Sequence, residues 1–163
     1  METRDRYAEA LADYVLAHGL AASSLRPMAK AAGTSDRMLV YHFHSKAGVL
    51  RAALGVIAAR TMLTLDAALP VHRQPTATLM TQLGEAMQGD AFRQSLAVFY
   101  ELAALSLRGD EVARDVGGRI AAHFQDWLAV RLTEPERAGE LLASIEGWGV
   151  LTAVGLDLPF PKG

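Results

Sequence analysis

The stretch LRPMAKAAGTSDRMLVYHF, residues 25–43, decides the fold of this chain. Its two helix-forming segments meet at Gly33, which lacks a Cβ and can adopt the backbone conformation of a tight turn. We expect a first short helix over about residues 25–32 and a second over about 35–41, capped by Thr34 or Ser35. The apolar residues that helical spacing places toward a core are Met28, Ala29, Ala32, Met38 and Leu39. This pattern predicts a helix-turn-helix, whose second helix can enter the major groove of DNA.

Helical patterns continue on both sides of this stretch. A helix over about residues 4–18 precedes it and ends at Gly19, and Ser23 or Ser24 is placed to cap the helix that follows. Ser45 is placed to cap a long helix that Pro70 ends. Further helices are expected over about 76–88, 91–108, 111–132 and 135–156, followed by a loose tail. We therefore predict an all-α chain with an N-terminal three-helix helix-turn-helix domain (1–48), joined by the long helix to a C-terminal helical domain (49–163).

Composition excludes several kinds of protein. The 163 residues are 51% hydrophobic and 21% charged, which suits a folded core, and none of them is cysteine. Disulfides, cysteine-ligated metals and thiol nucleophiles are therefore ruled out. The longest apolar run, 52–59, is far shorter than the roughly 20 residues of a membrane helix. Because we also find no export signal, we expect a soluble, cytoplasmic protein.

The charge is divided unevenly along the chain. Residues 1–60 contain eight Lys or Arg against five Asp or Glu, whereas residues 61–163 contain eight against thirteen. The N-terminal part (residues 1–60) is therefore basic and the remainder (residues 61–163, called the body below) is acidic. This division favours a polyanionic partner for the N-terminal part alone. We expect no enzyme, because no nucleophile–base set or phosphate-binding loop occurs. We also expect no metal site and no cofactor, since the pair His42 and His44 lacks a further ligand at suitable spacing.

Residues 6–54 resemble the DNA-binding domain of the TetR (tetracycline-repressor-like) transcriptional regulators. The matching text is LRPMAKAAGTSDRMLVYHFHSKAGVLRAAL, residues 25–54, and the spacing of the family's motifs is preserved without gaps. The motifs are Met28-Ala29, Ala32-Gly33, the capping Ser35, Leu39, the triplet Tyr41-His42-Phe43, and Ser45-Lys46. The chain departs from the family's usual residues at Asp36, Arg37 and Val40, which concerns the DNA sequence recognised more than DNA binding itself.

The resemblance implies roles for individual residues. Tyr41 and Lys46 would contact backbone phosphates, with His42 beside them and Arg26 approaching from the preceding helix. Ser35, Arg37 and Met38 would face the groove, where Arg37 can bond guanine and Met38 can touch a thymine methyl. Other interpretations stay open, since Tyr41 and Phe43 could be core aromatics and the cations could be merely solvated.

The resemblance also implies that the body forms a dimer and binds a small-molecule effector. Dimer residues are predicted on the apolar stripes of the last two helices: Val116, Ile120, Phe124, Trp127, Leu141, Ile145 and Trp148. The alternative is that these stripes pack within one subunit. The helix over 91–108 is apolar on nearly all sides, which predicts a course through the middle of the domain. Candidate effector-binding residues are Met62, Met80, Met87, Phe99, Glu101 and His123, with Glu101 as an anchor for a cationic compound. The alternatives are that Glu101 forms an internal salt bridge or lies on an exposed edge, and that the methionines and Phe99 are plain core residues.

The expected function is a ligand-responsive regulator, most simply a repressor. Its homodimer would bind a palindromic double-stranded DNA operator and would be released by the small molecule. The alternative is an all-helical small-molecule sensor or carrier whose helix-turn-helix does not bind DNA.

Overall fold

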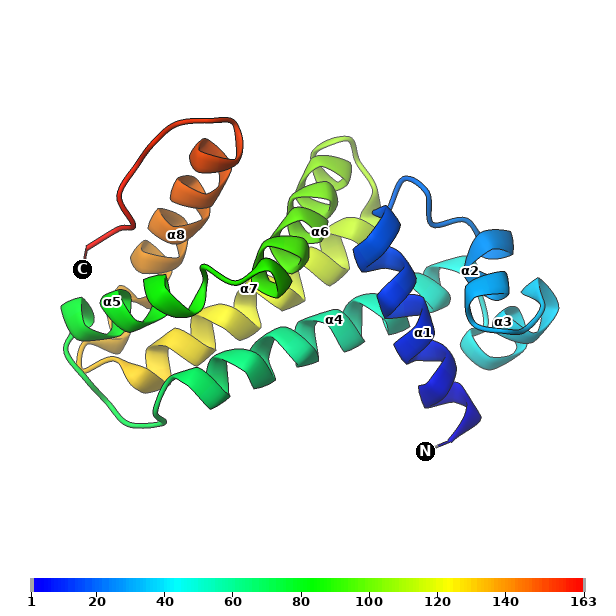
Figure 1. Ribbon diagram of the computed structural model, residues 1–163, viewed down its shortest axis with the longest axis horizontal. Helices are drawn as coiled ribbons and strands as arrows, with labels where there is room; N and C mark the ends of the chain where they lie inside the picture. The colour runs from blue at the N-terminus through cyan, green and yellow to red at the C-terminus, as the bar shows by residue number, and fades with distance from the viewer. Residues whose placement is uncertain (1, 163) are drawn as a thin grey trace. The chain divides into compact units, whose positions relative to one another are not determined.

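The computed structural model describes residues 2–162, which form helices joined by turns (Figure 1). No strand occurs in this range, where the single β-bridge pairs Gln74 with Leu132. The predicted all-α fold is therefore confirmed. The helices are α1 (Thr3–His18), α2 (Leu25–Ala31), α3 (Asp36–Phe43), α4 (Lys46–Ala68), α5 (Thr76–Ala86), α6 (Asp90–Leu107), α7 (Glu111–Arg131), the 3-10 helix η1 (Pro135–Arg137) and α8 (Ala138–Ala153).

Local capping explains where the N-terminal helices begin and end. Gly19 ends α1 with φ 75°, and its N–H donates to the carbonyl of Val15 at 2.8 Å. The Ser35 hydroxyl accepts from the N–H of Met38 at 3.3 Å, and the Ser45 hydroxyl accepts from Gly48 at 3.0 Å. These three predicted caps are confirmed.

The caps predicted at Ser23 and Ser24 differ from the structure. Ser24 stands at the N-cap position of α2, but its side chain makes no capping bond. Ser23 instead donates its hydroxyl to the carbonyl of Gly19 at 2.7 Å, so it closes the loop before the helix. Either serine hydroxyl could cap a helix, and the path of the loop decides which hydrogen bond each one makes.

The helix-turn-helix packs around a small apolar core. Met28, Ala29 and Leu39 are buried as predicted, and each large aliphatic side chain contributes about 1.5–3 kcal/mol when fully buried. The prediction that Met38 is buried is wrong, because its side chain is 39% exposed. Met38 directly precedes the buried Leu39, and consecutive helical residues differ by about 100° in direction. The turn between α2 and α3 is made by Gly33 at φ 66°, as its lack of a Cβ predicts.

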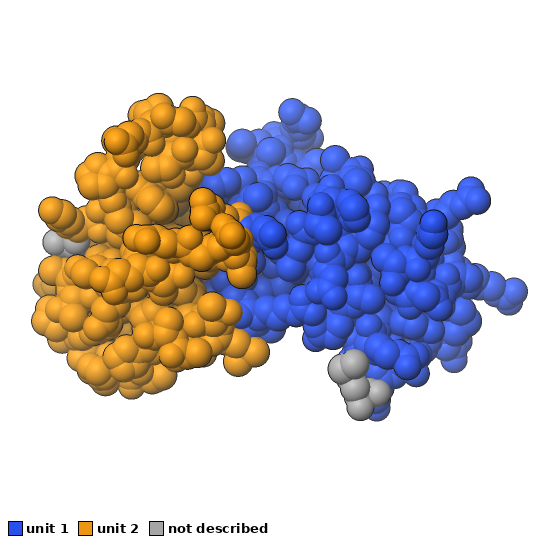
Figure 2. Space-filling view, in the orientation of Figure 1, with its two compact units in different colours: residues 1–62, 94–117 blue, residues 63–93, 118–163 orange. Residues whose placement is uncertain are grey.

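The chain divides into two compact units (Figure 2). The first contains the chain up to Met62 together with Gln94–Gly117, and the second contains Leu63–Arg93 together with the chain from Gly118 onward. Most of α6 and the start of α7 therefore belong to the same unit as the helix-turn-helix. These units are defined by packing, whereas the boundary expected after residue 48 separates DNA binding from effector binding, and that boundary stays a prediction.

In the first unit, α6 is less buried than its composition predicts. Val98 and Leu102 are buried, whereas Ala97, Ala103, Ala104 and Leu105 are exposed. The expected course of this helix through the middle of a domain is wrong, because small alanines give an apolar composition without requiring burial. Helix α4 is long and apolar enough to cross a membrane by length and composition alone. Its buried residues Val49, Ala53 and Ile57 belong to the protein core.

In the second unit, the indole N–H groups of both tryptophans, Trp127 and Trp148, make hydrogen bonds. Asp66 accepts from Trp127 Nε1 at 2.7 Å and pairs with the buried Arg131 at 2.5 Å. Trp148 Nε1 donates to the carbonyl of Leu158 at 3.0 Å, and the Phe160 ring packs against the Trp148 ring. The loose tail predicted over residues 158–163 is therefore wrong for Leu158 and Phe160, which contact Trp148, and Gly163 lies outside the described residues.

Candidate nucleic-acid interface

Helix α3 divides into a buried face and an exposed face. Leu39 and Phe43 point into the core, while Tyr41 has 72% of its surface exposed. Ser35, Asp36 and Arg37 at the start of the helix are also exposed. The interpretation of Phe43 as a core aromatic is confirmed, and the same interpretation of Tyr41 is wrong. The exposed face thus offers a hydroxyl, a guanidinium, a thioether and a phenol to a partner.

Aromatic contacts hold the C-terminal end of α3 against α1. The ring of His42 lies 5.3 Å from that of Tyr7 and 5.2 Å from that of Tyr41, in edge-to-face geometry. The guanidinium of Arg4 lies 5.4 Å from the centre of the Phe43 ring. Arg4 and Tyr7 were missed in the sequence, although their spacing of three places both on one face of α1. Their contacts restrict the orientation of His42 and add a cation beside α3.

The start of α4 completes the interface. Lys46 is exposed in the first turn, where the helix dipole and free N–H groups favour an anion. His44 connects α3 to α4 in the left-handed conformation, with φ 68°. A Cβ on Gly48 would lie 1.9 Å from the carbonyl oxygen of Phe43. The turn therefore brings the backbone of α4 against the end of α3, and Gly48 makes that approach possible.

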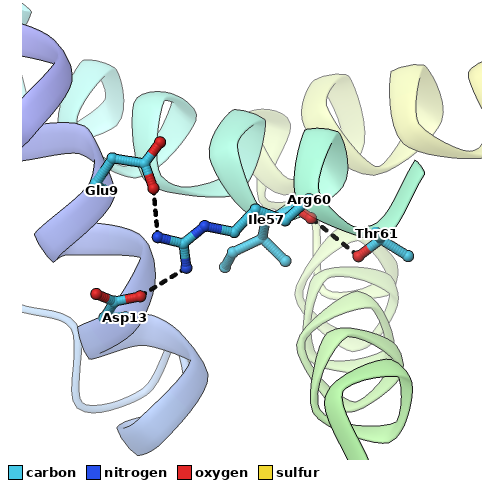
Figure 3. A network of polar contacts seen from close by, with 5 residues as sticks. All are labelled: Glu9, Asp13, Ile57, Arg60 and Thr61. Carbon is cyan, nitrogen blue, oxygen red and sulfur yellow. Dashed lines mark hydrogen bonds and ion pairs between the residues drawn. The ribbon is translucent and has the colours of Figure 1, made fainter. Parts of the chain in front are cut away.

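An ion-pair network joins α1 to α4 (Figure 3). The guanidinium of Arg60 pairs with Asp13 at 2.6 Å and with Glu9. The hydrogen bond to Asp13 raises the pKa of Arg60 above its ordinary value, with desolvation opposing and Glu9 assisting. A raised pKa means that the stabilisation is present below the ordinary pKa of arginine and is lost only at more alkaline pH. Arg60 therefore stays charged, and keeps its side of the ion pairs, up to strongly alkaline pH.

The remaining DNA-binding candidates are cations at the surface. Arg26 on α2, Arg37 on α3 and Lys46 on α4 are all exposed. His42 is half-buried between the two tyrosines. The structure thus leaves all seven predicted side chains at or near the surface of the helix-turn-helix, and their individual contacts with DNA remain predictions.

The predicted effector-binding residues do not gather in one unit. Met62, Phe99 and Glu101 belong to the first unit, and Met80, Met87 and His123 belong to the second. Met80 and Met87 are buried, and His123 is exposed. Glu101 accepts the backbone N–H of Leu20 at 2.7 Å. Its carboxylate is thus engaged by the loop after α1, a contact that differs from the expected ligand anchor, salt bridge or exposed edge.

The predicted dimer stripe lies mostly within the protomer. Five of its seven residues are buried, and Ile120 and Trp148 are half-buried. The five belong to the protein's own core: Val116, Phe124, Trp127, Leu141 and Ile145. This agrees with the alternative that the stripes pack within one subunit. A different face of α8 is exposed, with Ala143, Gly147, Val150 and Leu151, and the exposed Val154 follows at the C-cap.

Comparison with known proteins places the chain in a family. Residues 10–53 match the tetR family of bacterial regulatory proteins. The multidrug binding protein EbrR complexed with proflavin is 30% identical, over 98% of this chain and 92% of that chain, with a TM-score of 0.72. The ethidium complex of EbrR is 27% identical, over 98% and 92%, with a TM-score of 0.75.

A third structure supports the fold alone, and the curated sequences add nothing further. SCO7518 from Streptomyces coelicolor A3(2) is 22% identical, over 100% of this chain and 92% of that chain, with a TM-score of 0.76. No curated protein sequence matches the chain. The matched helix-turn-helix and the 30% identity to EbrR over nearly the whole length show that this chain belongs to the TetR family of transcriptional regulators.

Proposed function

We propose that this protein is a cytoplasmic repressor that binds a palindromic operator as a homodimer and leaves it when a small molecule binds the body. The exposed face of α3 is the observation that carries the DNA-binding part. A helix that buries Leu39 and Phe43 while exposing Arg37 and Tyr41 can lie in a major groove without unfolding. The basic charge of residues 1–60 supports a polyanionic partner there.

For the effector we propose a flat aromatic cation. EbrR has been crystallised with proflavin and with ethidium, and it is 26–30% identical to this chain. The acidic balance of residues 61–163 favours a cationic ligand. The second unit contains Trp148 and Phe92, which are half-buried and belong to the residue types whose rings bind aromatic cations. The alternative of a sensor without DNA binding predicts proflavin binding with no salt-dependent affinity for duplex DNA.

Operator release by proflavin tests the proposed function. An operator is first selected from a random pool of duplexes with the purified protein, and its affinity is then measured with and without proflavin. A coupling free energy of about 1–3 kcal/mol would lower operator affinity roughly 5- to 150-fold. Because proflavin also intercalates into DNA, the same titration with a duplex-binding protein of another fold is the control. An affinity that proflavin leaves unchanged would contradict the effector assignment.

The exposed face of α8 is the proposed dimer surface, with a second copy of the chain as its occupant. Its apolar residues recur at helical spacing, and Gly147 lies near the middle of the helix. Glycine there allows two helices related by a two-fold axis to approach closely, as in a four-helix bundle. The palindromic operator proposed above requires such a two-fold dimer.

Gly147→Glu is expected to dissociate the dimer. A Cβ at Gly147 meets nothing within 4 Å in the protomer, so the fold accepts the side chain. At a two-fold axis the two glutamates would face each other, and the dissociation constant should rise at least about tenfold, or roughly 1.4 kcal/mol. Sedimentation velocity across a concentration series measures the change. Gly55→Glu is the matched control, since that site on α4 is equally open; equal effects of both variants would rule out this face.

A further inference from the structure

A carboxylate from α6 grips the loop between α1 and α2. Glu101 Oε2 accepts the N–H of Leu20 at 2.7 Å and lies 3.4 Å from the N–H of Ala21. Among the residues that the structure describes, neither of these N–H groups donates to a backbone carbonyl. Hydrogen bonds to an ionised carboxylate are stronger than neutral ones. The contact joins residues that are 80 positions apart in the chain.

The loop is shaped to receive this carboxylate. Gly19 adopts φ 75°, and a Cβ at that position would lie 2.7 Å from Glu101 Oε1. Ser23 closes the loop from the other side through its hydroxyl bond to the Gly19 carbonyl. Leu20 and Ser23 are both buried, although the loop also contains the exposed Ala21 and Ala22. The contact between Glu101 and the loop therefore depends on both the positive φ of Gly19 and its lack of a Cβ.

Helix α6 is also bonded to α4 within the same unit. The hydroxyls of Thr61 and Ser95 lie 2.9 Å apart, and Ser95 precedes Glu101 on α6 by less than two turns. The first residues of α6, up to Arg93, belong to the second compact unit, and the rest of the helix belongs to the first. Helix α6 thus begins with residues of the second unit and, within the first unit, contacts the loop between α1 and α2 through Glu101.

We infer that Glu101 is a positioning residue that couples α6 to the DNA-reading helices, an inference that rests on the proposed function. The carboxylate sets the loop 19–24, and this loop sets α2 relative to α1. Because α3 packs on α2 through the Gly33 turn, a displacement of α6 reaches the reading helix through this contact. Glu101 itself touches neither DNA nor effector in this assignment.

The test uses the full-length variants Glu101→Ala and Glu101→Gln. For each, operator affinity is measured with and without proflavin, and amide hydrogen exchange is measured at Leu20 and Ala21. We expect Glu101→Ala to speed exchange at both amides at least tenfold and to reduce the proflavin effect on operator affinity to less than twofold. Glu101→Gln keeps one carbonyl acceptor, so it should restore part of both effects. Glu111→Gln, an exposed glutamate of α7 in the same unit, should leave both at wild-type values.

Two results would overturn the inference. One is wild-type exchange at Leu20 and Ala21 in Glu101→Ala. The other is fast exchange together with an unchanged ratio of operator affinities, which is the expected result for a purely structural contact. A wild-type protein that does not bind duplex DNA, or does not respond to proflavin, refutes the proposed function and the coupling with it. The exchange rates still decide in that case whether the carboxylate holds the loop.

Discussion

Replacing Arg37 and Tyr41 together by alanine is expected to abolish detectable binding to the selected operator. Arg37 can donate two hydrogen bonds to a guanine edge, a contact worth about 1–3 kcal/mol per base pair. The Tyr41 hydroxyl adds a phosphate contact on the same exposed face of α3. Both losses occur in each half-site of a dimer, so affinity should fall by at least about 100-fold. Fluorescence anisotropy with a labelled operator measures this change.

Two single variants separate the reading face from charge alone. Lys46→Ala should weaken binding to all duplexes alike and reduce the salt slope of log affinity by about one, because Lys46 is assigned to a phosphate. Arg73→Ala removes one exposed positive charge from the second unit and should leave operator binding at the wild-type level. Because Arg37 and Tyr41 are both exposed, the double variant should keep the wild-type melting temperature. Tight operator binding by that double variant would contradict the assigned face.

Gly48→Ala is expected to cause the largest loss of stability among the glycine substitutions. Its Cβ would lie 1.9 Å from the Phe43 carbonyl oxygen, which is backbone and cannot rotate away. The end of α3 and the start of α4 would have to move apart, at a cost on the order of 3 kcal/mol, the upper range for overpacking. At about 2–4 °C per kcal/mol, the melting temperature should fall by roughly 10 °C. Differential scanning calorimetry measures both quantities.

Gly55→Ala is the matched control in the same helix. A Cβ at Gly55 meets nothing within 4 Å, so alanine should stabilise α4 by up to about 1 kcal/mol through its helix propensity. The two substitutions add the same methyl group to one helix, seven residues apart. If Gly48→Ala lowers the melting temperature and Gly55→Ala raises it, the loss is due to the close approach of Gly48 to the Phe43 carbonyl. Equal melting temperatures for both variants would show that the turn adjusts freely.

The sequence alone predicted the features that depend on near neighbours in the chain. Ser35 and Ser45 bond N–H groups three residues away, and Gly19 and Gly33 supply local turns. Such contacts can be read from spacing because the geometry of a helix end is the same in every protein. The helix-turn-helix belongs to this class, since helical periodicity predicts the burial of Met28, Ala29 and Leu39. The exposed face with Tyr41 was expected from the resemblance to the TetR regulators, and periodicity alone misplaced Met38.

The tertiary structure decided every feature that depends on which segments pack together. Periodicity predicted apolar stripes on the last helices, but packing showed that Phe124, Trp127 and Ile145 belong to the protomer and that α8 exposes another face. Glu101 was chosen for its charge, and only the fold brings it to the N–H of Leu20. Many apolar surfaces could cover such a stripe, and many N–H groups or cations could bind such a carboxylate. The partner is selected by three-dimensional proximity, which residues 81 positions apart do not encode in their spacing.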